Sequence, residues 1–215
     1  MDIRSLQTRH PLCEVDTFRL YEALYKGGRT FRGILPQILQ RQPQDTDAVY
    51  QLRIKEASYR PYVGQIVRAY AGTLFASHYA IRAKRDDKPE DLDPFYATIK
   101  EDCDGQGTDL TSFFKDRFRN ALVNCASFWV VEMPRKGPED MGLTEDEWHA
   151  QGHDRARLRA LDTSSVLDWE ADADGCFAWV KVHDRTMKRV DPGSPAVIVD
   201  TWRIYYPDRC DVYQI

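Results

Sequence analysis

The sequence predicts an α+β fold, in which helices, mainly in the first half, pack on a mostly antiparallel sheet formed by the second half. Two patterns carry this prediction. Apolar residues recur every three or four positions up to about residue 125, which is typical of amphipathic helices. After residue 155 the chain alternates apolar and polar residues and carries hairpin turns. We therefore expect one α+β domain over residues 1–215, helix-rich over 1–125 and strand-rich over 126–215.

Composition restricts the class of protein. The 215 residues are 42% hydrophobic and 30% charged, and the formal net charge is −4, which disfavours wholesale disorder and a dedicated non-specific nucleic-acid binder. The five cysteines are odd in number and never spaced as CxxC, as in free thiols of a reducing compartment. No signal peptide is recognisable, and no apolar run approaches the roughly 20 residues that span a bilayer. We expect a soluble protein made in a cytoplasm.

The central stretch, residues 102–134, predicts a capped helix that leads into a strand. It opens with a glycine-bearing polar loop, after which Thr108 or Asp109 can cap a helix. The apolar stripe of this helix is Leu110, Phe113, Phe114, Phe118, Ala121, Leu122 and Cys125. Residues 128–131 are aromatic and β-branched, which favours a buried strand that Pro134 closes.

Two helices are expected near the N-terminus. The first begins after Asp16 and ends at Gly27–Gly28, since glycine commonly follows the last helical turn. Residues 33–44 contain two prolines, so we expect a loop with a short helical turn there. The second helix covers residues 46–59, and its apolar residues should face inward: Val49, Leu52 and Ala57.

The cleanest amphipathic helix covers residues 61–75. Its apolar residues come in adjacent pairs every three or four positions: Tyr62, Val63, Ile66, Val67, Tyr70, Ala71, Leu74 and Phe75. A strand with one solvated face should follow at Tyr79 and Ile81. Residues 85–94 are charged and contain prolines, so we expect a surface loop.

The second half predicts short strands joined by turns. Residues 155–160 alternate arginine with alanine or leucine, as a strand does. The strongest turn signal is Ala173-Asp174-Gly175. Further strands are expected at residues 166–169, 177–182, 197–206 and 210–215. Because the sequence ends inside this series, we expect the last strand to pair with another subunit, or the natural protein to continue beyond Ile215.

Two acidic loops have the beginnings of a calcium-binding pattern, at residues 102–107 and 170–175. The twelfth position of such a loop should be a bidentate glutamate, and here it is Phe113 in the first and Lys181 in the second. We therefore expect both to be turns.

A pair of histidines offers the alternative of a metal site. His149 and His153 are four residues apart, the spacing that places two imidazoles on one helix face. A short helix is expected around Trp148, because Thr144 and Glu147 have the spacing of a capping box. The order HExxH is absent, so we expect structural or solvated histidines. The alternative is a metal-dependent hydrolase that uses both histidines and nearby carboxylates.

The chain lacks the local signatures GxSxG, GxxxxGK[ST] and GxGxxG, so we expect no enzyme, no catalytic residues, no cofactor and no metal. Arg155, Arg157 and Arg159 should line one face of a strand. With Arg135 and Lys136 they can form a basic patch for phosphate or for an acidic partner. The alternative is a solvated face that protects the strand from aggregation.

Large aromatic residues are mostly periodic: Tyr62, Tyr70, Phe113, Phe114, Phe118, Trp129, Trp169, Trp179 and Trp202. We expect them in the core. Their excess also fits a protein that buries surface against copies of itself.

Four segments follow one another in a characteristic order. They are Leu24-Tyr25-Lys26-Gly27-Gly28-Arg29; the pattern YxxxVxxxVxxxxGxLF from Tyr59 to Phe75; the loop Asp104–Leu110 with its helix and the strand Phe128–Pro134; and Val166-Leu167-Asp168-Trp169 through Gly175 to Val182. This order, over most of residues 15–185, resembles the N-terminal, wing-like part of tailed-bacteriophage portal proteins. Such portals have a glycine where this chain has Asn124-Cys125-Ala126, and they are about twice as long.

The resemblance implies a structural subunit of a phage or prophage portal ring, typically of twelve copies, at one capsid vertex. Double-stranded DNA would pass through the ring during packaging and ejection without sequence-specific binding. Terminase and head–tail connector proteins would dock on the ring. The expected location is the virion, and the bacterial host cytoplasm during assembly. The alternative is a non-enzymatic α+β adaptor that reads an acidic partner through Arg155, Arg157 and Arg159.

Overall fold

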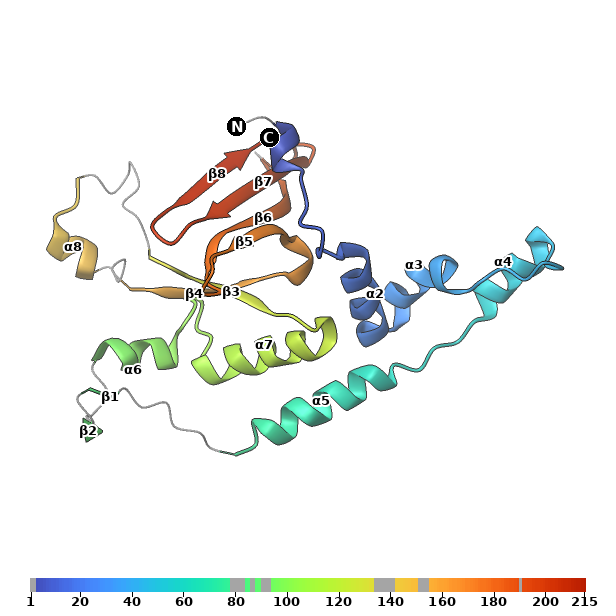
Figure 1. The fold of residues 1–215 in the computed structure, drawn as a ribbon, viewed down its shortest axis with the longest axis horizontal. Coiled ribbons are helices and arrows are strands. Elements are labelled where there is room, and N and C mark those ends of the chain that lie inside the picture. The colour runs from blue at the N-terminus through green and yellow to red at the C-terminus, as the bar shows by residue number, and fades with distance from the viewer. Residues whose placement is uncertain are drawn as a thin grey trace. The chain divides into compact units, whose positions relative to one another are not determined.

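The computed structural model describes residues 3–77, 84–85, 88–89, 94–133, 142–150, 155–189 and 191–215. Helices lie mainly in the first half and antiparallel sheets in the second, so the fold is α+β as predicted (Figure 1). The chain divides into two compact units. Met1–Leu20 with Asp162–Ile215 form the first, here named the sheet unit, and Tyr21–Leu161 form the second, the helical unit. The expectation that residues 1–215 form one domain stays a prediction.

The sheet unit contains a four-stranded antiparallel sheet in the order β5-β6-β7-β8. Neighbours in the sheet are also neighbours in the chain (Figure 1), which confirms the predicted series of strands. The elements are η2 (Thr163–Ser165), β5 (Val166–Ala171), β6 (Phe177–Lys188), β7 (Val197–Tyr205) and β8 (Cys210–Gln214). Strand β6 extends well beyond its predicted end at residue 182.

The acidic loop between β5 and β6 is a hairpin turn, as predicted. The Asp172 side chain accepts hydrogen bonds from the backbone N–H groups of Asp174, at 3.0 Å, and Cys176, at 2.8 Å. Gly175 has a φ of 80°, which glycine adopts without a steric penalty. The side chain of Asp172 therefore stabilises the turn that sets the register of β5 against β6.

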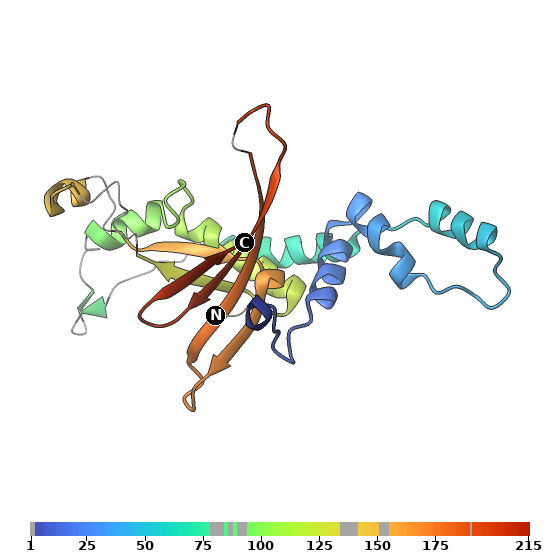
Figure 2. The ribbon, with the colours of Figure 1, turned by 90° about the horizontal axis from the view of Figure 1, so that it is seen from above.

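The far ends of β6 and β7 form a projecting ribbon. Strand β5 pairs with β6 only as far as Val182, and β8 pairs with β7 from Thr201 onward. Among the described residues, positions 186–188 of β6 and 197–199 of β7 therefore pair only with each other. Figure 2 shows this ribbon extending beyond the rest of the sheet.

The N-terminal segment belongs to the sheet unit although it is far from the strands in sequence. Helix α1 (Ile3–Leu6) places Leu6, 2% exposed, in a cluster with Trp202 and Ile204. The backbone N–H of His10 then donates to the carbonyl oxygen of Leu167 at 2.9 Å. This segment thus completes the hydrophobic core of the sheet.

The helical unit contains most of the helices and a two-stranded antiparallel sheet, β3–β4. Its elements are the end of α2 (Val15–Lys26), α3 (Gly28–Ile38), α4 (Asp47–Glu56), α5 (Tyr62–Leu74), β1 (Lys84–Arg85), β2 (Lys88–Pro89), α6 (Pro94–Glu101), α7 (Leu110–Asn124), β3 (Phe128–Glu132), α8 (Glu145–Ala150) and β4 (Arg157–Leu161). Figure 1 shows α5 and α6 beside α7.

Helix α7 begins where the sequence predicts. The Asp109 side chain accepts a hydrogen bond from the backbone N–H of Ser112 at 2.9 Å and caps the helix. The helix ends at Cys125, whose φ of 58° lies in the left-handed region that usually requires glycine. Strand β3 follows directly, so the predicted helix–strand unit is confirmed.

The core of the helical unit joins α7 to the loop before it and to β4. Cys103, Leu110 and Phe113 are buried together, and Ile99 of α6 and Leu158 of β4 pack against them. The predicted core position of Phe113 is therefore confirmed.

Strand β3 is less buried than predicted. It pairs with β4 alone among the described residues, with Phe128 opposite Leu161. Trp129 is 45% exposed and Val131 61% exposed, although the Trp129 ring meets the Phe114 ring of α7 edge to face, with 5.9 Å between the ring centroids.

The predicted loop at residues 33–44 is wrong over its first half, where α3 lies. Phe31 and Leu35 are four residues apart and buried, so one apolar face holds this helix to the unit. Pro36 lies in the last turn, where it removes one backbone hydrogen bond, and the helix ends two residues later at Ile38.

Helix α4 forms where predicted and is capped by Thr46, but the predicted inward orientation of its apolar residues is wrong. It has no buried residue, and Val49 and Leu52 are about half exposed. Polar contacts attach it instead, including a hydrogen bond from the Tyr50 hydroxyl to the Leu39 carbonyl oxygen at 2.9 Å.

The predicted strand at Tyr79 and Ile81 lies outside the described residues, as do Arg135, Lys136 and most of the charged loop at 85–94. The short helix around Trp148 is confirmed as α8. The predicted capping box is present, since Thr144 and Glu147 each accept a backbone hydrogen bond from the other.

Candidate functional site

Two of the three predicted arginines lie in one groove of the helical unit. Arg157 and Arg159 are two residues apart on β4, so they project from the same face of the strand. They line a groove of about 490 Å³ together with Arg117 of α7, which sequence reasoning did not single out. Arg155 precedes the strand, is exposed, and is not part of the groove lining.

The loop before α7 forms one wall of this groove and is held by its own carboxylates. Asp102 accepts hydrogen bonds from the backbone N–H groups of Gly105, at 2.8 Å, and Gly107, at 3.0 Å. Asp104 accepts hydrogen bonds from the backbone N–H groups of Gln106, at 2.8 Å, and Thr108, at 3.2 Å. The predicted turn is thereby confirmed, because both carboxylates satisfy backbone donors of the loop.

Backbone hydrogen bonds fix this loop to β4. The N–H of Cys103 donates to the carbonyl oxygen of Thr108 at 2.9 Å and closes the loop. The N–H of Leu158 donates to the carbonyl oxygen of Cys103 at 2.7 Å. The loop and the arginine-bearing strand are consequently held in a defined relative position.

Arg157 packs directly on the backbone of Gly105. Gly105 has a φ of 76°, and a Cβ atom there would lie 2.9 Å from Nε and 3.0 Å from Cζ of Arg157. Any larger residue would push the guanidinium away. The glycine of the loop therefore has two roles: it allows the turn, and it makes room for Arg157.

The acidic residues of the groove lining are already engaged. Glu132 lies 3.3 Å from Nη1 of Arg159, and Asp116 pairs with Arg119. Burial alone would raise the pKa of Asp104, but hydrogen bonds from the side chain of Thr108 and from the backbone hold it below its ordinary value. Each of these three carboxylates therefore already has a partner within the chain.

The three arginines differ in their contacts. Arg117 lies over the Phe113 ring and donates from Nη1 to the Leu161 carbonyl oxygen at 3.4 Å. Arg159 contacts Glu132. Arg157 is half-buried and has no hydrogen bond or ion pair in the part of the chain that the structure describes. Its guanidinium is thus a positive group in a groove, without a described counter-ion.

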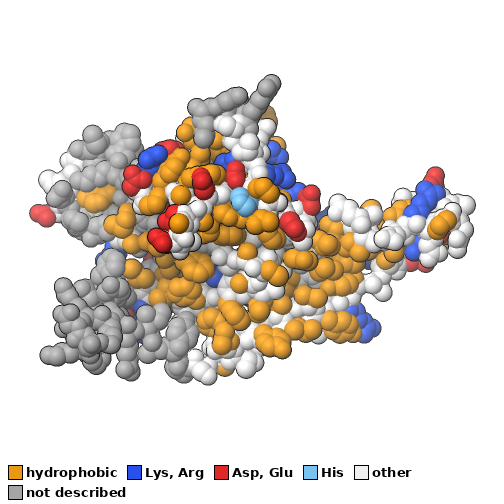
Figure 3. Space-filling model, in the orientation of Figure 1, with side chains coloured by type: hydrophobic (Ala, Val, Ile, Leu, Met, Phe, Trp, Pro, Cys, Tyr) orange, Lys and Arg blue, Asp and Glu red, His pale blue; other side chains and the backbone are white. Residues whose placement is uncertain are grey.

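Helix α5 carries a second surface of interest. Its small residues, Gly64, Val67 and Ala71, are buried within the helical unit. Its large apolar residues are all exposed: Tyr62 56%, Val63 41%, Ile66 55%, Tyr70 67% and Leu74 57%. The expected core position of Tyr62 and Tyr70 is therefore wrong, because close packing of the small face turns the large one outward. Apolar side chains line α5 in Figure 3.

The projecting ribbon of the sheet unit is also apolar at its end. Met187 is 76% exposed, Val197 57% and Ile198 51%. Met187 lies opposite Ile198 in the register, so both project from one face of the ribbon.

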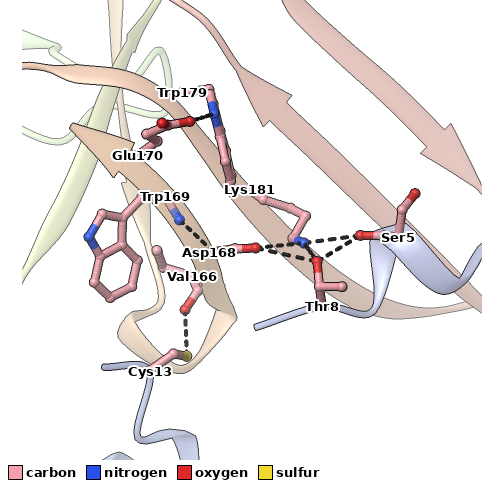
Figure 4. Close-up of polar contacts among 9 residues, drawn as sticks. All are labelled: Ser5, Thr8, Cys13, Val166, Asp168, Trp169, Glu170, Trp179 and Lys181. Carbon is pink, nitrogen blue, oxygen red and sulfur yellow. Dashed lines mark hydrogen bonds and ion pairs between the residues drawn. The ribbon is translucent and has the colours of Figure 1, made fainter. Parts of the chain in front are cut away.

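A buried ion pair ties the N-terminal segment to the sheet (Figure 4). The Lys181 side chain is 4% exposed, and its Nζ lies 3.1 Å from Oδ2 of Asp168. The same Nζ donates to the Thr8 hydroxyl at 2.6 Å and to the Ser5 carbonyl oxygen at 3.2 Å. From the sequence, Lys181 was identified only as the residue that occupies the twelfth position of the second calcium-like loop, and its ion pair was not predicted. No local pattern reveals its partners, because Ser5 and Thr8 lie at the other end of the chain.

The predicted histidine pair falls where the side chains are not described. His149 lies in α8, but its side chain is outside the described residues, and so is His153 altogether. Within the part of the chain that is described, no three His, Cys, Asp or Glu side chains gather as metal ligands would. The same part contains no helix long and apolar enough to cross a membrane.

Comparisons with known proteins give no family to which this chain can be assigned. The sequence matches no family model, and no curated protein matches it significantly.

Proposed function

We propose that this chain is a structural, non-catalytic subunit of a phage or prophage portal-like ring through which DNA is packaged and ejected. The ordered segments described above motivate the proposal, and the exposed apolar face of α5 is the structural observation that carries it. In this proposal the chain acts in the virion and assembles in the host cytoplasm. Its partners are further copies of itself, DNA passing through the ring, the terminase and head–tail connector proteins.

The composition of α5 supports burial against another chain. Arg68 is the only charged residue in its 13 positions. Apolar residues cover far more of its circumference than the small buried face at Gly64, Val67 and Ala71 requires. Contiguous apolar patches larger than a few hundred Å² are rare on monomers and mark interaction sites. Covering the exposed side chains would contribute on the order of 5 kcal/mol before the costs of association.

A ring also needs a second, different surface on each subunit, because its contacts are heterologous and repeat head to tail. The apolar end of the β6–β7 ribbon supplies such a surface. A partner on the ribbon would stabilise it, since an isolated two-stranded hairpin is marginal in water.

Multi-angle light scattering of the purified chain tests the proposal. We expect a mass well above the 24.9 kDa of one chain and annular particles in electron images. Ile66→Asp places a charge in the α5 face and should reduce the mass to that of a monomer. Leu52→Asp is the matched control, because Leu52 also lies on a helix, α4, and is exposed to nearly the same extent as Ile66, 50% against 55%. A monomer at tens of micromolar, for this chain and for any longer natural product of its gene, would contradict the proposal.

The gene's neighbourhood offers an independent test, because an adjacent large terminase gene is expected for a portal. The alternative of an adaptor that reads an acidic partner has one observation in its favour: the Arg157 guanidinium has no ion pair among the described residues. A metal-dependent hydrolase would instead require bound zinc or manganese, which elemental analysis of the purified chain detects.

A further inference from the structure

We propose that the groove between β4 and the loop before α7 binds a carboxylate of an acidic polypeptide segment on a partner protein, with Arg157 as the anchoring cation. This site does not depend on the ring. It is argued from the position of Arg157, from the charges around it and from the rigidity of its support.

Arg157 is a cation of the groove for which the described residues provide no ion pair. A guanidinium that is half-buried has lost part of its hydration, and this loss is offset only when a counter-ion takes the place of water. The described residues supply no such counter-ion to Arg157, whereas Arg159 has Glu132 at 3.3 Å. A carboxylate entering the groove can accept two parallel N–H bonds from the planar guanidinium.

The support of Arg157 reduces the entropy lost on binding. Its guanidinium packs on the backbone of Gly105, in a loop that four backbone-to-carboxylate hydrogen bonds stabilise. The loop is in turn bonded to β4 through Leu158. A long arginine side chain normally loses much rotamer freedom when it binds, and here part of that freedom is already lost in the unbound protein.

The charge balance of the groove favours a polypeptide over a nucleic acid. Three arginines and three carboxylates, Asp104, Asp116 and Glu132, line it, so their formal charges sum to zero. Nucleic-acid backbones carry closely spaced phosphates and bind surfaces with a basic excess. An acidic peptide can instead bind Arg157 through one carboxylate, while its uncharged residues lie beside the carboxylates of the groove lining.

The experiment measures binding of a fluorescein-labelled decapeptide of alternating glutamate and glycine to the full chain by fluorescence anisotropy. Arg157→Gln should weaken binding at least tenfold. Arg155→Gln is the matched control, because it removes the same charge two residues away and outside the groove, and should change binding less than twofold. Glu132→Gln should strengthen binding several-fold, since it releases Arg159 to the ligand. The circular dichroism spectrum and the unfolding midpoint of each variant verify that it folds.

Two further measurements test the geometry and the ligand class. Arg157→Lys keeps the charge but removes the planar fork, and should weaken binding about fivefold; full retention would refute two-point recognition. Equal losses for Arg157→Gln and Arg155→Gln, or no binding at millimolar peptide, would overturn the site. Displacement of the peptide by a 20-base-pair DNA duplex, with a steep dependence on salt, would overturn the choice of a polypeptide.

Discussion

Replacing Lys181 by methionine should destabilise the sheet unit strongly. The ammonium group is buried and pairs with Asp168 at 3.1 Å, while Thr8 and Ser5 accept its remaining hydrogen bonds. Removing one partner of a buried ion pair costs about 3–5 kcal/mol, because the other charge is left without compensation. Asp168 keeps 17% of its side chain exposed and a hydrogen bond from Thr8, so we expect a loss near the lower end, about 3 kcal/mol.

Urea unfolding followed by tryptophan fluorescence measures this loss. Three of the five tryptophans, Trp169, Trp179 and Trp202, lie in the sheet unit and report on it. Lys188→Met is the control, because Lys188 lies on the same strand, β6, but is exposed. It should change the free energy of unfolding by less than about 0.5 kcal/mol, as surface substitutions usually do.

A double variant separates the ion pair from simple packing. Lys181→Met combined with Asp168→Leu should recover most of the lost stability, since apolar replacement of a whole buried pair is often neutral or favourable. The stacking of His10 on Trp169, whose ring centroids are 4.1 Å apart, should also weaken in the single variant as the N-terminal segment detaches. A loss below about 1 kcal/mol for Lys181→Met, or one equal to that of Lys188→Met, would refute the reasoning.

Three other outcomes are expected. Cys125→Gly should stabilise the helical unit by about 1 kcal/mol in urea unfolding, because it relieves a left-handed backbone; a loss of stability would contradict this. Burial of the Cys103 thiol, and to a smaller extent the nearby Asp104 carboxylate, raises the pKa of this thiol to about 11. A thiol reagent at pH 8 should therefore label the exposed Cys176 but react with Cys103 only after unfolding. The hydrogen bond from Arg185 holds the pKa of Asp200 below its ordinary value. This pair therefore stabilises the fold above about pH 4 and ceases to do so as the pH falls through the lowered pKa. Arg185→Gln should raise the pKa of Asp200 in an NMR titration, and an unchanged pKa would refute the assignment.

Local features of the fold were predictable because their causes lie within a few residues. Asp109 caps α7 through the N–H of Ser112, three residues away. The turn at Gly175 and the capping box of α8 likewise depend on neighbours in sequence. Such signals located the starts of α7 and α8 and the turn between β5 and β6.

Burial was less predictable because it depends on which elements meet. The same apolar periodicity that predicts α5 also suggests that Tyr70 is buried, yet the helix packs through Gly64 and Ala71 instead. In α3, a proline suggested a loop, but burial of Phe31 and Leu35 outweighs the one hydrogen bond that Pro36 removes near the helix end.

The sequence by itself determined the α+β class, the capped helices and the hairpin turns. It also indicated Arg157 and Arg159 as candidate contacts for phosphate or an acidic partner. Only the tertiary structure decided that Arg117 and a glycine-containing loop join these arginines in one groove, and that Lys181 holds the N-terminal segment to the sheet. The reason is physical. A cap or a turn is satisfied by atoms a few residues away, whereas a charge removed from water finds its partners among residues that only folding brings together.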